Sequence, residues 1–128
     1  MLLLCLGLAG AVQAQLPVSA FTLAWDHSVE KIRWEEDYRV SEQGLRLEQA
    51  RIRGSGAGME IPADAVLHDG FWHYTPHLPP LPLLRLGRAP GIEDYELCVD
   101  GHCRAMGAWI GPPESPAAAV ELWVCGDR

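Results

Sequence analysis

The sequence predicts a small antiparallel all-β fold, a sandwich or an open barrel built from hairpins. Short stretches of alternating apolar and polar residues are typical of half-buried strands. Clusters of Gly, Pro and Asp separate these stretches at short intervals, as turns do in all-β proteins. No segment has a convincing amphipathic helical period over three turns, and the 128 residues fit one small domain.

The strands follow from this alternation. Residues 21–25 form a first strand, and residues 34–40 and 45–52 form a hairpin in which Val40 pairs with Leu45. A second hairpin joins residues 63–67 to 71–74 through the Asp69-Gly70 turn, since Asp-Gly favours two-residue turns. The remaining strands are expected at 82–88, 95–99, 102–106 and 119–125. Prolines make residues 77–84 an extended connector, and residues 111–119 a loop or linker.

The N-terminal stretch MLLLCLGLAGAVQAQ predicts a signal peptide over 1–14 and a single domain over 15–128. Its apolar part is shorter than the about 20 residues that span a bilayer. Val12-Gln13-Ala14 resembles a cleavage site. No Lys or Arg precedes the apolar part, which leaves an upstream start, an atypical signal or a buried first helix of a cytosolic domain as alternatives. Export predicts a periplasmic or secreted protein that does not span the membrane once the signal is removed.

The charge of −7 limits the partners of the protein. An acidic domain is repelled by phosphate backbones and by anionic lipid surfaces, so nucleic acid is not expected as a partner. The five tryptophans supply much apolar area for a small domain, and some of them are expected in the core.

The cysteines predict a disulfide. Cys98 and Cys103 flank the Asp100-Gly101 turn and face each other at a non-hydrogen-bonded pair, close enough to bond. Zinc is the competing interpretation, but this pair supplies only two ligands. Cys125 is either a buried thiol or takes one partner from the pair.

The stretch HSVEKIRWEED, residues 27–37, is the strongest candidate site. Strand alternation places Glu36 on the apolar face, opposite Gln49, whereas Glu35 points the other way with Asp37 and Arg39. A carboxylate on an apolar face costs several kcal/mol unless it is paired. The partners expected for Glu36 are His27, Lys31, Arg33 and Arg51. The alternative is a strand end where the pattern breaks at the surface.

Other motifs support catalysis poorly. His27 and Ser28 are adjacent and point to opposite faces, and Ser55 lacks the glycines of a nucleophile elbow. The run from Gly54 to Gly58 fits neither a dinucleotide fingerprint nor a phosphate loop. Its glycines suit an irregular turn that brings backbone amides near another segment or a small anion, or a bend between sheets. A metal site at His68, His73 and His77 is conceivable but has loose geometry.

The blocks FTLAWDHSVEKIRWEEDYRV, ARIRGSGAGMEIP and HDGFWHY resemble the bacterial family called domain of unknown function 1850. The resemblance runs from about Phe21 to the last strand. It places the family's most specific positions at His27, Ser28, Val29, Glu30, Glu35, Glu36, Gly56, Ala57 and Gly58. This chain has Ile32-Arg33 where the family often has Thr-Pro. Members look exported, and their genes commonly lie beside those of TAXI-type tripartite ATP-independent periplasmic (TRAP) transporters, which implies an accessory role in solute uptake without supplying a reaction.

The leading hypothesis is a secreted binding or accessory protein without cofactor or metal. Its expected site joins His27, Ser28, Glu30, Glu35 and Glu36 to Gly54, Ser55, Gly56 and Gly58, and the expected partner is a TRAP substrate-binding protein or permease. A metal-assisted hydrolase that uses His27 with Glu30 or Glu36 is the second hypothesis. A structural module of a transporter complex with an exposed tryptophan face is the third.

Overall fold

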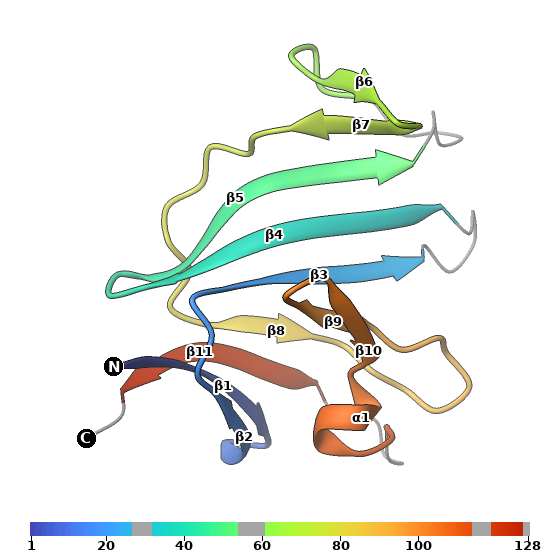
Figure 1. Cartoon of the computed structure of the whole chain (residues 1–128). Helices are drawn as coiled ribbons and strands as arrows, with labels where there is room; N and C mark the ends of the chain where they lie inside the picture. Colours follow the sequence, from blue (N-terminus) through green and yellow to red (C-terminus); the bar gives the residue numbers. More distant parts are fainter. Residues whose placement is uncertain (27–31, 54–60, 114–118, 127–128) are drawn as a thin grey trace.

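The protein is an all-β sandwich of two antiparallel sheets that do not close into a barrel (Figure 1). The computed structural model describes residues 1–26, 32–53, 61–113 and 119–126. The four-stranded sheet has the order β2 (Ala11–Leu16), β1 (Leu2–Leu8), β11 (Val120–Gly126), β8 (Leu84–Leu86). The seven-stranded sheet has the order β10 (His102–Ala105), β9 (Glu96–Val99), β3 (Ala20–Asp26), β4 (Arg33–Ser41), β5 (Gly44–Arg53), β7 (Phe71–Tyr74), β6 (Val66–His68).

Both Asp-Gly turns form as the sequence predicts. Asp69 and Gly70 have φ values of 53° and 81°, and Asp100 and Gly101 have values of 52° and 79°. Positive φ at both central residues is the requirement of the type I′ hairpin turn, which matches the twist of its two strands. These turns therefore join β6 to β7 and β9 to β10.

The hairpin of β4 and β5 contains a β-bulge that the sequence did not predict. Val40 pairs with Leu45 and Tyr38 with Leu47, as expected, but the register then shifts between Asp37 and Tyr38. Glu36 consequently lies opposite Ala50, and the prediction that it faces Gln49 is wrong. Because side chains alternate with a period of two, the extra residue also reverses the faces of the following β5 residues.

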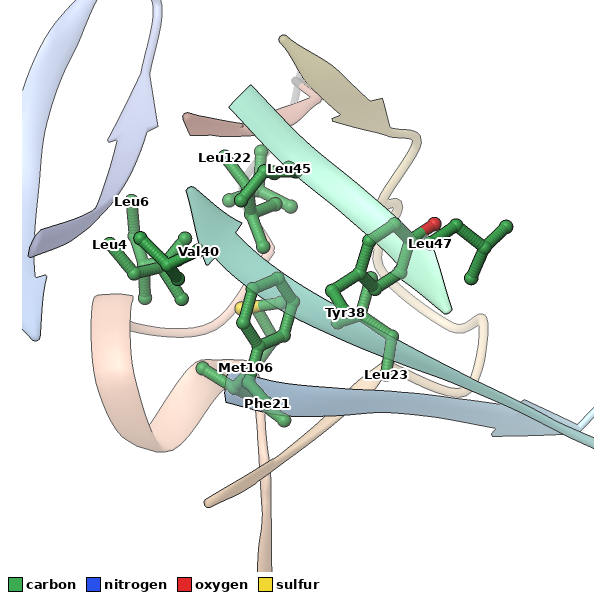
Figure 2. Close-up of a cluster of buried hydrophobic side chains, with 12 residues drawn as sticks. Leu4, Leu6, Phe21, Leu23, Tyr38, Val40, Leu45, Leu47, Met106 and Leu122 are labelled. Atoms are coloured by element: carbon green, nitrogen blue, oxygen red, sulfur yellow. The ribbon is translucent and has the colours of Figure 1, made fainter. Parts of the chain in front are cut away.

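The core lies between the two sheets where β1 and β11 pass over β3, β4 and β5 (Figure 2). Leu4, Leu6, Leu23, Leu45 and Leu97 are fully buried there. Phe21 and Tyr38 stack at 5.3 Å between ring centroids and extend the core along the inner face of β3 and β4. Trp25 and Trp109 are partly buried and pack against its margin, but none of the five tryptophans belongs to the buried core itself.

The N-terminal segment forms the hairpin β1–β2 in the structure. β1 pairs with β11 from Leu2↔Gly126 to Leu8↔Val120, and Cys5 forms a disulfide with Cys125. The alternatives in which Cys125 is a free thiol or bonds to the other hairpin are therefore wrong. Cleavage after Ala14 stays a prediction, and a chain that begins at Gln15 would lack β1 and this disulfide.

The predicted connector 77–84 lies outside the named strands except for Leu84, which begins β8, and Leu81 makes a β-bridge with Leu45. Gly44 fits against this bridge, since a Cβ at Gly44 would lie 2.5 Å from the carbonyl oxygen of Leu81. The helix α1 (Gly107–Ile110) is a single turn. None of the helices in the described ranges is long and apolar enough to cross a membrane.

Candidate functional site

The strand β4 carries the candidate site on both of its faces. Glu35 and Asp37 point to the outer face of the seven-stranded sheet, away from the four-stranded sheet, as the alternation predicts. Glu36 shares the inner face with Tyr38 and Val40, which lie in the core. Glu36 is thus separated by the sheet from its neighbours Glu35 and Asp37, and the two faces give the carboxylates different surroundings.

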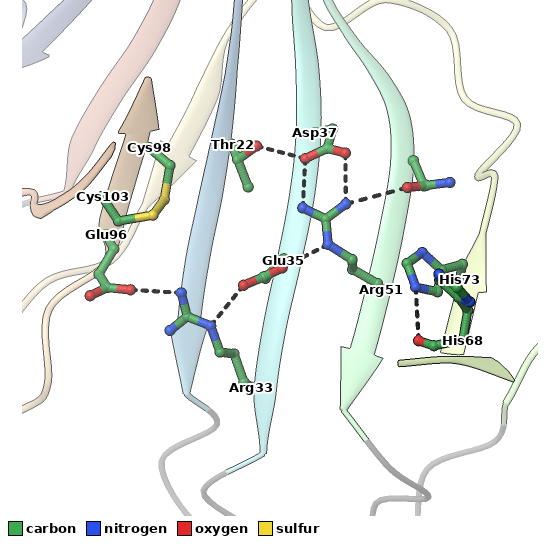
Figure 3. A network of polar contacts seen from close by, with 11 residues as sticks. Thr22, Arg33, Glu35, Asp37, Arg51, His68, His73, Glu96, Cys98 and Cys103 are labelled. Atoms are coloured by element: carbon green, nitrogen blue, oxygen red, sulfur yellow. Dashed lines mark hydrogen bonds and ion pairs between the residues drawn. A yellow bond between two sulfur atoms is a disulfide. The ribbon is translucent and has the colours of Figure 1, made fainter. Parts of the chain in front are cut away.

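On the outer face, Arg51 of β5 holds two carboxylates of β4 (Figure 3). Its Nε donates to Glu35 at 2.7 Å, and its two terminal nitrogens donate to Asp37 at 2.7 and 3.0 Å. The bulge explains this arrangement, because the unbroken register would place Arg51 opposite Trp34 on the inner face. With the bulge, Arg51 lies directly opposite Glu35.

The same network continues toward β3 and β9. Arg33 donates to Glu35 at 2.8 Å and forms an ion pair with Glu96 at 2.8 Å, and the hydroxyl of Thr22 donates to Asp37 at 2.6 Å. Burial acts to raise the pKa of Glu35, but the hydrogen bonds from Arg33 and Arg51 outweigh it and lower this pKa. The pKa of Asp37 is lowered in the same way by Arg51 and Thr22. Both carboxylates are therefore held in the charged form.

A cleft of about 530 Å³ opens on this face beside the disulfide hairpin. Its floor includes the Arg51 network, and its wall includes Cys98 and Cys103, which are bonded as predicted. Among the described residues, one basic side chain, Arg51, lines the cleft together with four acidic ones, Glu35, Asp37, Glu48 and Asp100. The size falls in the range of small-molecule sites in proteins, about 300–1,000 Å³. We call this feature the outer cleft.

On the inner face, Glu36 is half-buried and accepts a hydrogen bond of 2.8 Å from the hydroxyl of Tyr38. Burial raises the pKa of Glu36, and the hydrogen bond from Tyr38 offsets part of this effect. The expectation that Arg33 and Arg51 are its partners is wrong, because both side chains point to the outer face and bind Glu35. The other two expected partners, His27 and Lys31, lie outside the described residues.

Aromatic side chains share the inner face of the sheet with Glu36. Burial and then the charge of Glu36 raise the pKa values of Tyr74 and Tyr95, so both phenols lie within its electrostatic reach. Trp25 stacks on Trp34 at 6.0 Å between centroids and meets Tyr95 at 5.7 Å. The indole nitrogen of Trp34 is buried and has no hydrogen-bond partner in the described part of the chain.

Comparison with known protein families matches residues 21–106 to the family described as "Domain of unknown function (DUF1850)". The chain belongs to this family. The match starts at Phe21, as the sequence resemblance predicts, and ends at Met106, before the last strand. Searches of curated proteins and of solved structures found no match.

The most specific family blocks of this DUF1850 member fall largely outside the described residues. These are His27, Ser28, Val29, Glu30, Gly56, Ala57 and Gly58, and the expected site residues Gly54 and Ser55 also lie outside the described residues. The strand ends that flank them are described: Asp26 pairs with Arg33, and Ile52 with Trp34. The described strand ends that flank the two segments therefore lie at the same end of β3, β4 and β5, next to Trp34. Of the expected site residues, the structure places Glu35 and Glu36, on opposite faces.

The three histidines considered for a metal site, His68, His73 and His77, lie in the β6–β7 hairpin and in the connector that follows it. The rings of His68 and His73 lie 5.8 Å apart, and the Nε2 atom of His73 lies 3.3 Å from the backbone oxygen of His68. His77 is exposed in the connector. Within the residues that the structure describes, no group of three or more His, Cys, Asp or Glu side chains is arranged to hold a metal ion.

Sequence reasoning missed Thr22, Asp37, Arg51 and Glu96 as one network. The signal was present in part, because Arg33, Glu35, Asp37 and Arg39 alternate along β4 as an outward charged row. The pairing of β4 with Arg51 depends on the bulge, and the pairing with Glu96 depends on contact between β3 and β9, which are distant in the sequence.

Proposed function

We propose that this DUF1850 protein is an exported accessory protein that binds a ligand or a partner for TAXI-type TRAP solute transport, with the outer cleft as its binding site. The observation that carries the proposal is a cleft whose floor is a connected ion-pair network. Arg51 bridges Glu35 and Asp37, and Arg33 extends the bridge to Glu96.

The network supports binding because it fixes the side chains before a ligand arrives. Arg51 makes hydrogen bonds to two acidic residues, and Arg33 makes a hydrogen bond to Glu35 and an ion pair with Glu96. Glu35 accepts from both arginines. A binding group held in one geometry loses little conformational entropy when it meets its ligand. One side of the cleft is the short hairpin β9–β10, which the Cys98–Cys103 disulfide cross-links.

The charge of the outer cleft indicates what it attracts. Glu48 and Asp100 are exposed at the cleft and stand outside the Arg51 network. Glu48 forms an exposed ion pair with Arg39 at 3.1 Å, and Arg51 is already paired with two carboxylates. A concave surface lined mainly by one sign of charge raises the local concentration of the opposite sign. The cleft is suited to a basic side chain of a partner or to a cationic group of a ligand.

Location and context support the same function. Disulfides persist in oxidising compartments such as the periplasm, and both disulfides of this protein fit such a location. The family resemblance implies that its members are exported and act beside TAXI-type TRAP transporters. A substrate-binding protein or a permease of such a system is the proposed partner.

The test is co-purification of the tagged full chain from native membranes, with bound proteins identified by mass spectrometry. We expect a TRAP substrate-binding protein or permease to co-purify with the wild type. Glu48→Gln combined with Asp100→Asn removes two cleft charges without touching the Arg51 network, and should reduce this recovery. Asn also suits the positive φ of 52° at Asp100.

The matched control is Glu42→Gln combined with Asp64→Asn, which removes two exposed charges away from the outer cleft. This variant has the same net charge as the cleft variant, so a general effect of charge would affect both equally. Equal recovery of the transporter component by the two double variants, or its absence from the wild-type sample, would refute the proposal.

A further inference from the structure

The inner face of the seven-stranded sheet carries a second group of side chains, separate from the outer cleft. The core cluster includes Tyr38 and Val40 of β4 but not Trp34 or Glu36, which lie farther along the same strand. Glu36 is thus at the border where the core ends and the inner face continues. Both Trp34 and Glu36 are half-buried.

Strand register arranges the neighbours of Glu36 in two rows across β3, β4, β5 and β7. One row consists of Leu23, Glu36, Ala50 and Tyr74. The next row, two residues along each strand, consists of Trp25, Trp34, Ile52 and Trp72. Opposed residues of an antiparallel pair point to the same face, so both rows share the inner face with the core. The small side chain of Ala50 is the only one between Glu36 and Tyr74 within its row.

Glu36 is therefore a single carboxylate among aromatic side chains. Tyr38 donates a hydrogen bond to it along β4, and Tyr74 follows in the same row. Burial and then the charge of Glu36 raise the pKa of Tyr95. In the part of the chain that the structure describes, no Lys, Arg or His forms an ion pair with Glu36. Arg33 and Arg51 are bound to Glu35 on the other face, and Arg53 lies over the ring of Phe71.

This combination favours one class of ligand. Aromatic faces attract organic cations through their quadrupoles, and quaternary ammonium groups are recognised by such rings. A partly desolvated carboxylate gains most from a cation that brings its own apolar surface, since a hydrated inorganic ion would have to lose its water. The indole N–H of Trp34 is buried and has no acceptor among the described residues, and Trp34 lies two residues from Glu36 on the same face of β4.

We propose that the inner face around Glu36, Trp34 and Tyr74 is a binding site for a small organic cation, a quaternary or protonated amine that also carries a hydrogen-bond acceptor. The carboxylate pairs with the cationic group, the rings of the second row pack against its alkyl groups, and Trp34 donates to the acceptor. The site is independent of the outer cleft, because the sheet lies between them.

The test uses calorimetric titration of the purified full chain, with disulfides intact, by two probes of the same shape. Choline carries the cation and a hydroxyl group, and 3,3-dimethylbutan-1-ol replaces its nitrogen by carbon and is neutral. We expect choline to bind at least about 10-fold more tightly than the neutral probe, a difference of about 1.4 kcal/mol. Glu36→Gln should abolish this preference while it keeps the shape of the side chain.

Two controls make the outcome decisive. Glu42→Gln removes an exposed charge of the hairpin loop and should leave choline affinity unchanged. The double variant Glu48→Gln/Asp100→Asn alters the outer cleft and should also leave it unchanged, so a failure of one site is not mistaken for a failure of the other. The comparison of the two probes on the wild-type protein does not depend on whether Glu36→Gln folds. Equal affinity for choline and its neutral analogue, or no binding of choline at millimolar concentration, would overturn the proposal.

Discussion

Glu35 and Glu36 are consecutive on β4, yet their carboxylates belong to different electrostatic environments. Glu35 accepts hydrogen bonds from Arg33 and Arg51 on the outer face, whereas Glu36 accepts one from Tyr38 on the inner face. The pKa of Glu35 is lowered by its two arginines in spite of burial, and burial raises the pKa of Glu36. The two residues therefore affect stability in opposite directions as pH changes.

Glu36→Gln is predicted to stabilise the free protein near neutral pH. A carboxyl group whose pKa is raised in the folded state binds its proton more tightly there than in the unfolded state. Its contribution to stability is consequently lost as pH rises through the folded pKa. Gln removes the charge, and its amide oxygen can still accept from Tyr38. Urea unfolding at pH 7 should show a higher midpoint for Glu36→Gln than for Glu42→Gln, and a lower one would contradict the assignment of Glu36 to a desolvated position.

Acid should lower the free energy of unfolding through the carboxylates whose pKa values are lowered in the folded state. The pKa values of Glu35, Asp37 and Asp94 are lowered by their hydrogen-bond partners, although burial acts against this. Their contribution is present above the unfolded pKa, about 4, and is lost as pH falls through the lower folded values. Unfolding free energies measured from pH 6 down to pH 2 should fall over this range. A stability independent of pH there would mean that the network is not formed in solution.

Arg51→Met is predicted to destabilise the protein by about 1–3 kcal/mol, the scale for hydrogen bonds to charged groups. The substitution leaves Glu35 and Asp37 without their shared cation in a partly buried position. Arg39→Met is the control, because the Arg39–Glu48 pair is exposed and such pairs contribute roughly 0–1 kcal/mol. If chemical denaturation shows the same loss of unfolding free energy for Arg51→Met and Arg39→Met, Arg51 contributes no more than an exposed surface pair.

Gly44→Ala is predicted to destabilise the protein by about 1–3 kcal/mol, the cost of overpacking and of strained backbone. The new Cβ would lie 2.5 Å from the carbonyl oxygen of Leu81, and the φ of 126° at Gly44 disfavours a side chain. Thermal unfolding of Gly44→Ala should be compared with that of Gly87→Ala, where nothing lies within 4 Å of the new Cβ. A loss at Gly87 as large as at Gly44 would show that the contact with Leu81 is not the cause.

The hairpins were predictable from the sequence because their determinants are local. Asp69-Gly70 and Asp100-Gly101 specify their own turns, and Val40 and Leu45 are separated by a short loop. The bulge opposite Asp37 was not predictable, since no local signal shows that the register slips after Leu47. That slip moves Arg51 to the outer face, so the partner of Glu35 could not be named from spacing alone.

The N-terminal pairing was missed for a different reason. Residues 2–8 are apolar throughout and form β1, an interior strand between β2 and β11, and the same composition is typical of a signal peptide. The partner strand β11 lies more than 100 residues later, as the 120-residue separation of Cys5 and Cys125 shows. Composition alone does not distinguish a central strand from a secretion signal.

Peptide mapping without reduction tests the pairing of all four cysteines. The structure predicts that Cys5 is linked to Cys125 and Cys98 to Cys103. The expected stabilisation by the Cys5–Cys125 bond is about 2–4 kcal/mol, because it closes a long loop. Terminal sequencing of the exported protein decides between its retention and the predicted cleavage, since a chain that starts at Gln15 contains no Cys5.

The central claim is that the outer cleft is the surface through which this protein acts, and calorimetry with a purified partner tests it most directly. The wild type, the cleft variant Glu48→Gln/Asp100→Asn and the control Glu42→Gln/Asp64→Asn are each titrated with the substrate-binding protein of the cognate TAXI-type system. We predict that the cleft variant binds at least about 10-fold more weakly than the wild type, about 1.4 kcal/mol, while the control binds like the wild type. Indistinguishable affinities of the two double variants, or no binding by the wild-type chain, would contradict the claim.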